Sequence, residues 1–135
     1  MNERSHSLLK IRPQLLAAKV TEEMSVEERF QNQTLRPIIK LQNQLLLDVF
    51  QNYIVKRKNR FYELPLEDRM AYITHAIQKD LKFRNSLKGM IIGHFSVEEY
   101  ERYIAHSSAL NKRMMAMVIK RIQDQIQYFE KTVVA

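Results

Sequence analysis

Glycine is nearly absent from this sequence, whose 135 residues contain only Gly89 and Gly93. Glycine is the residue that adopts positive φ without penalty, so its scarcity excludes a glycine-rich phosphate loop and disfavours a sheet joined by tight turns. Long helices are the natural alternative. The two glycines also mark residues 88–95 as the segment where the chain can turn sharply or let another backbone approach.

Cysteine and long apolar runs are absent as well. Without cysteine there is no disulfide, no thiolate nucleophile and no cysteine-ligated metal. No apolar run approaches the about 20 residues that cross a bilayer, so we expect no membrane partner. These absences fit a reducing compartment, and we expect a cytoplasmic protein.

Three short segments carry the signals of a helix start. Ser25 and Ser96 each precede a glutamate by three residues, the spacing of a capping box. Pro65 can occupy the first helical position, where its missing N–H costs nothing. Acidic residues follow in each first turn, as the helix dipole favours.

The spacing of apolar residues predicts three long helices. The first begins near Phe30 and ends over residues 56–60. Because Pro37 lacks an N–H, we expect a kink or a restart of this helix near Thr34. The second begins at 65–66 and ends at Gly89 as its C-cap. The third covers 97–131, and we favour a continuous or mildly kinked helix over a break at 106–108. We therefore expect an all-α, up-down antiparallel bundle of three long helices, in which kinks raise the count to four or five.

Residues 1–24 have a different pattern from the remainder. Pro13 and the irregular apolar spacing prevent a long helix there. We expect residues 1–24 to form an N-terminal arm, extended or partly disordered or laid across a neighbouring surface. Residues 25–135 would form the helical bundle domain.

The net charge of +7 raises the question of a nucleic-acid partner. The densest basic patch consists of Lys56, Arg57, Lys58 and Arg60. Cations at a helix C-terminus also complement the helix dipole, and this single rule explains most of the charge pattern. We therefore do not expect a nucleic-acid partner. Such a function would require the patch to share a face with Lys82 or Lys88.

The segment 83–95 combines both glycines with several polar side chains. It suggests a small-ligand or anion site, with or without catalysis, at which the helix start at Ser96 offers N–H groups and Arg84 or Lys88 assists. The candidate lining residues are Arg84, Asn85, His94, Tyr100, Tyr103 and His106. The alternative, which we favour, is a helix corner where the Gly-x-x-x-Gly spacing permits close packing. The site hypothesis fails if those side chains diverge.

Catalytic and metal-binding patterns are missing. No His-Glu-x-x-His motif occurs, so we expect no metal, no cofactor and no catalytic residue. Apolar positions such as Leu46, Leu47 and Met114 exceed what one helix face needs, so a third helix or another subunit must cover them. The leading expectation is a non-enzymatic interaction module that self-associates or docks on a protein partner.

Two segments carry a resemblance to known proteins: Phe30–Phe50 (FQNQTLRPIIKLQNQLLLDVF) and Phe83–Ile104 (FRNSLKGMIIGHFSVEEYERYI). They resemble a family of short bacterial helical proteins without an assigned role, and the similarity covers most of the chain after Thr21. Some members carry the label glyoxalase. That enzyme class holds a metal with histidines and glutamates in a β-rich fold. No strands are predicted here, so we carry over no catalytic residue.

Overall fold

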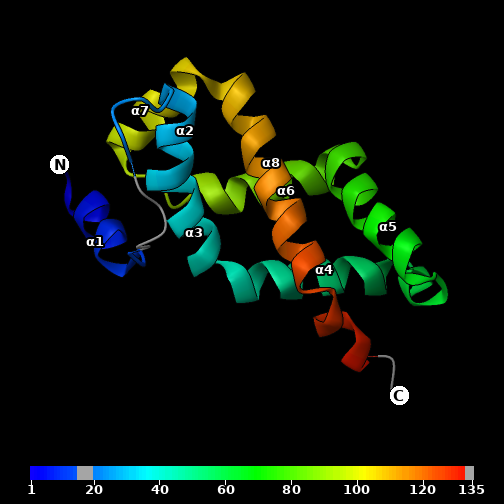
Figure 1. Ribbon diagram of the computed structural model, residues 1–135. Coiled ribbons are helices and arrows are strands. Elements are labelled where there is room, and N and C mark those ends of the chain that lie inside the picture. The colour runs from blue at the N-terminus through cyan, green and yellow to red at the C-terminus, as the bar shows by residue number, and fades with distance from the viewer. Residues whose placement is uncertain (15–19, 133–135) are drawn as a thin grey trace.

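The computed structural model describes residues 1–14 and 20–132, which form helices and no strands (Figure 1). The chain is 81% helical, which confirms the all-α prediction. The elements are α1 (Glu3–Ile11), α2 (Val26–Phe30), the π-helix η1 (Gln31–Leu35), α3 (Arg36–Leu41), α4 (Asn43–Lys56), the 3₁₀ helix η2 (Arg60–Glu63), α5 (Leu66–Lys79), α6 (Leu81–Ile92), α7 (Val97–Ala105), α8 (Ser107–Asp124) and the 3₁₀ helix η3 (Ile126–Thr132).

Each of the three predicted long helices is interrupted. Within the described ranges the seven α-helices α2–α8 take their place, so the prediction of three long helices is wrong. The breaks fall at Gln42, Asp80 and His106, where ψ is 4°, 96° and 31°. Asp80 caps α6, because its side chain accepts a hydrogen bond from the backbone N–H of Phe83 at 3.2 Å. The favoured continuity of 97–131 is also wrong, since the chain turns at His106.

The irregularity predicted for the first helix lies next to Pro37. The π-helix η1 ends two residues before this proline, which occupies the start of α3. Proline cannot donate to the carbonyl four residues earlier, so the ladder of α-helical hydrogen bonds is disturbed there. The irregularity predicted near Thr34 therefore takes the form of the π-helical segment η1.

The predicted helix starts are confirmed with small differences. Ser96 makes a complete capping box with Glu99, whereas Ser25 accepts only from the N–H of Glu28. Pro65 precedes the first helical residue of α5 rather than occupying that position.

The two glycines differ in outcome: Gly93 lies at the turn predicted within residues 88–95, whereas Gly89 does not have its predicted role. Helix α6 continues past Gly89 to Ile92 and its C-cap is Gly93, so the predicted cap at Gly89 is wrong. A Cβ at Gly89 would meet no atom within 4 Å outside its own helix backbone, so the predicted close packing at this glycine is absent.

Helix α8 is the centre of the core and contacts α3, α4, α5, α6 and α7. Figure 1 shows α4 running across α8 rather than alongside it, which differs from an up-down bundle. Leu46, Leu47, Leu110 and Met114 are all buried within the single chain. A third helix, not another subunit, therefore covers these surplus apolar positions.

The end of the core near α4 and α5 is aromatic. Phe50 is fully buried and its ring lies close to those of Tyr53, Phe61, Tyr72 and Phe83, at centroid distances of 5.8–6.3 Å. Such ring pairs add packing energy beyond their buried area and restrict rotamers. This cluster supports the surface on which the basic residues lie.

Residues 3–11 form the helix α1 rather than an extended arm. The Asn2 side chain caps it by accepting from the N–H of Ser5 at 2.8 Å. Helix α1 is laid across the α6–α7 corner of its own chain. The part of the predicted arm at 15–19 lies outside the described residues.

Candidate functional site

The N–H groups at the start of α7, predicted to bind an anion, are used by the chain itself. The backbone N–H of Ser96 donates to the Glu99 carboxylate at 2.8 Å, and that of Val97 donates to the Ser5 hydroxyl at 3.2 Å. The side chain of Glu99 is buried. Its carboxylate therefore occupies the position that an external anion would need.

Two arginines from the N-terminal segment complete this corner. Arg12 donates to both carboxylate oxygens of Glu99, at 2.6 Å and 2.9 Å, and to the carbonyl of His94. Arg4 donates to the carbonyls of Gly93 and Phe95 at the end of α6. Sequence reasoning missed both arginines, because their partners lie 82–91 residues further along the chain.

The ionisation state of the corner follows from these contacts. Burial opposes ionisation of Glu99, but hydrogen bonds from Arg12, Ser96 and Thr34 outweigh it and hold the pKa of Glu99 below its ordinary value. Burial, with the charges of Arg12 and Arg4, lowers the pKa of His94. The corner thus contains a buried ion pair beside a histidine whose neutral form is favoured.

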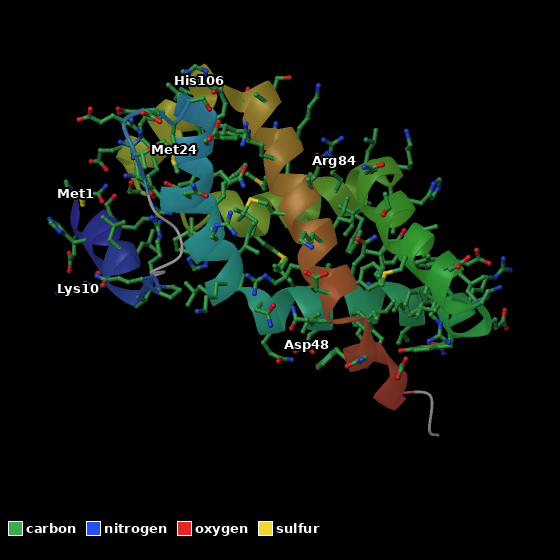
Figure 2. The ribbon with its side chains drawn as sticks, viewed as in Figure 1. Met1, Lys10, Met24, Asp48, Arg84 and His106 are labelled. Carbon is green, nitrogen blue, oxygen red and sulfur yellow. The ribbon has the colours of Figure 1, made fainter. Side chains whose placement is uncertain are left out.

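The six residues predicted to line a ligand site have mostly separate environments. Tyr103 is buried and donates to Asn111 at 2.5 Å, while the neighbouring Tyr100 is exposed. His106 is exposed and lies 3.7 Å from the Glu27 carboxylate. Figure 2 shows Arg84 on a different part of the molecule from His106. None of the six lines the cavity between α2 and α8, the hollows beside α4 or the hollow beside α3.

The basic patch of residues 56–60 lies close to Lys82, which belongs to helix α6. Two adjacent hollows share Lys56 and Arg57. One, of about 370 Å³, is also lined by Lys58, Arg60 and Tyr72. The other, of about 330 Å³, is also lined by Tyr53, Asp80 and Lys82. We call Lys56, Arg57, Lys58, Arg60 and Lys82 the cationic surface.

Arg57 is fixed at the centre of the cationic surface. Its guanidinium lies 3.5 Å from the centroid of the Tyr53 ring and donates to Asp80 at 2.7 Å. Tyr53 donates to the same carboxylate at 3.1 Å, and burial together with this bond raises the pKa of Tyr53 to about 12. Asp80 therefore balances one cation of the surface, which is Arg57.

The other four cations of the surface are exposed. Within residues 1–14 and 20–132, the side chains of Lys56, Lys58, Arg60 and Lys82 make no hydrogen bond or ion pair. Like charges held near one another raise the local potential and attract anions. Sequence reasoning named four members of this surface, and it named Lys82 only as one of two residues that a nucleic-acid function would require on the same face.

The backbone that carries the patch is strained. Lys58 and Asn59 have φ values of 61° and 58°, in the left-handed region that glycine prefers. Asparagine tolerates this region, whereas a lysine there costs about 1 kcal/mol. The turn directs the chain from α4 into η2 and sets Arg60 beside Lys56.

Metal and membrane features are missing from the part of the chain that the structure describes. No group of three or more His, Asp or Glu side chains there could hold a metal ion. None of the described helices has the length and apolarity to cross a bilayer.

Comparisons of the chain with protein-family models, with curated proteins and with solved structures found no match. The resemblance to short bacterial helical proteins therefore stays a prediction.

Proposed function

We propose that the protein is a non-enzymatic binding module whose cationic surface binds the phosphate backbone of a nucleic acid. The observation that carries this proposal is the convergence of four unpaired cations and Arg57, from α4, the following turn and α6, around two adjacent hollows. In the sequence analysis, a nucleic-acid function required the basic patch to share one face with Lys82 or Lys88. Phosphate neutralisation by lysine and arginine supplies most of non-specific nucleic-acid affinity.

The composition of the surface favours nucleic acid over an acidic protein. Three of its five cations are lysines, a residue type that is depleted in protein interfaces. The Tyr72 ring lines the more basic hollow and is half-buried, so its accessible part offers a stacking partner for a base. Cations that follow a backbone beside an aromatic ring are typical of single-strand binding without sequence preference.

Binding of a labelled oligo-dT strand, followed by fluorescence anisotropy at several salt concentrations, tests the proposal. Four unpaired cations predict a log–log salt slope of about −3, because each neutralised phosphate of a single strand contributes about 0.7. The triple variant Lys56→Gln, Lys58→Gln, Lys82→Gln should reduce the slope to about −1 and weaken binding at low salt.

A charge-matched control is available in Lys10, Lys40 and Lys112, which are exposed and lie outside the surface. The triple Lys→Gln variant at these positions changes the net charge equally and should retain most of the affinity. Equal losses in both triple variants, or no binding at low salt, would contradict the proposal. Displacement of the strand by poly-glutamate as readily as by unlabelled oligo-dT would point to an acidic protein instead.

A second candidate function is self-association or docking on a protein partner, and one apolar stripe on α7 favours it. Val97, Tyr100 and Ile104 follow one another at helical spacing and are 43%, 47% and 55% exposed. Light scattering at low micromolar concentration measures self-association. A dimer that Ile104→Glu dissociates supports this candidate, and a strict monomer removes self-association through α7.

A further inference from the structure

A separate cavity of about 440 Å³ lies between α2, η1, α7 and α8. Met24, labelled in Figure 2, lies at its edge beside α2. Cavities of this volume are of the size that holds small organic ligands. The cavity shares no lining residue with the cationic surface, so a ligand bound in it would contact none of those cations.

The floor of this cavity is apolar and preformed. Phe30 and Leu110 line it and are 5% and 1% exposed. Phe30 is held by an edge-to-face contact with Phe95, at a centroid distance of 5.4 Å. The Met24 sulfur accepts a hydrogen bond from Asn32 at 3.6 Å, which fixes this flexible side chain. The floor therefore offers a defined surface to an apolar group.

Two arginines from different helices provide the charge of the cavity. Arg29 comes from α2 and Arg102 from α7, and both are exposed. Arg29 makes one weak hydrogen bond, to the Thr21 carbonyl at 3.4 Å, and Arg102 makes none within the described residues. Among the described residues, no carboxylate lines the cavity. Both guanidiniums are thus available to an oxyanion, whose geometry matches their paired N–H donors.

We infer that this cavity binds an amphipathic oxyanion, an apolar chain or ring that carries a carboxylate or phosphate head. The apolar body lies on Phe30 and Leu110, and the head lies between Arg29 and Arg102. The hydroxyl of Thr34, which also lines the cavity, donates to Glu99 at 2.7 Å and is fixed in place.

Titration calorimetry of the full chain with decanoate, decyl phosphate, decanol and acetate tests this inference. We expect saturable binding of one decanoate or decyl phosphate per chain, with the tighter of the two identifying the head group. Decanol lacks the charge and acetate lacks the apolar body, so each should bind at least about tenfold more weakly, as expected for loss of a charged hydrogen bond or of several buried methylenes.

The double variant Arg29→Gln, Arg102→Gln should lose at least about tenfold in affinity for the anionic probes while its affinity for decanol is unchanged. Lys40→Gln, Lys112→Gln is the charge-matched control, because both lysines are exposed and lie outside the cavity and the cationic surface, so their removal should leave these affinities unaltered. Equal binding of decanol and decanoate overturns the inference, as does unaltered decanoate affinity in the double variant or the absence of saturable binding of both anions at millimolar concentration.

Discussion

The α6–α7 corner and the cationic surface both contain several basic side chains, but their charges are balanced differently. At the corner, Arg4 and Arg12 donate to backbone carbonyls and to the buried carboxylate of Glu99. At the cationic surface, Asp80 pairs with Arg57 and the four remaining cations have no partner within the described residues. Internal partners make the first set part of the fold. Their absence leaves the second set available to an external anion.

Backbone strain also differs between the two regions. The corner has ordinary backbone conformations, with Gly93 in the right-handed helical region. The cationic surface holds Lys58 and Asn59 at positive φ. Strain of this kind is maintained by the surrounding structure and is frequent at binding sites. We therefore expect substitutions at the corner to change stability and substitutions at the cationic surface to change binding.

Replacing Glu99 with glutamine should have the largest effect on stability. The Glu99 and Arg12 side chains are 6% and 8% exposed, so the substitution leaves a largely buried guanidinium without its counter-charge. We expect a loss of about 3 kcal/mol in the free energy of unfolding, measured by urea denaturation. Glu101→Gln, on the exposed side of the same helix, should change it by less than about 0.5 kcal/mol. A similar loss in both variants would contradict a structural role for the ion pair.

The stability contributed by Glu99 should depend on pH. Its pKa in the folded protein lies below the ordinary value of 4.5, so the unfolded chain binds its proton first. The contribution is complete above pH 4.5 and is lost as the pH falls through the lower folded pKa. Urea denaturation at a series of acidic pH values measures this loss. The Glu99→Gln variant should lack that part of the decline, and an identical decline in both proteins would show that another group causes it.

Lys58→Gly should separate stability from binding, with a smaller effect. Glycine removes the strain at positive φ but increases the entropy of the unfolded chain, so we expect a net gain of about 0.5 kcal/mol in the free energy of unfolding. The same substitution removes one phosphate contact and should make the salt slope of oligo-dT binding less steep by about 0.7. Lys58→Gln tests the charge alone and should change the slope without the stability gain. Unchanged binding in both variants would exclude Lys58 from the interface.

Only some residues of the candidate sites could be predicted from the sequence. The four clustered cations could be named because they lie within five consecutive residues, and sequence neighbours at a helix end stay neighbours in space. Lys82 could not be assigned to the same surface, since its position depends on the break at Asp80 and on how α6 turns back beside α4. The cavity at Phe30 and Leu110 was not foreseen, because four separate elements form its walls.

Local chemistry in the sequence determined the helical class, the starts at Ser25 and Ser96 and the disturbance before Pro37, because each depends on a few neighbouring residues. The tertiary structure decided where long amphipathic segments break and which charges are balanced. Arg12 and Glu99 illustrate the reason: they are 87 residues apart, and only packing brings the guanidinium to the carboxylate. The same packing gives no such partner to Lys56, Lys58, Arg60 or Lys82 within the described residues, and this difference separates a structural corner from a candidate binding surface.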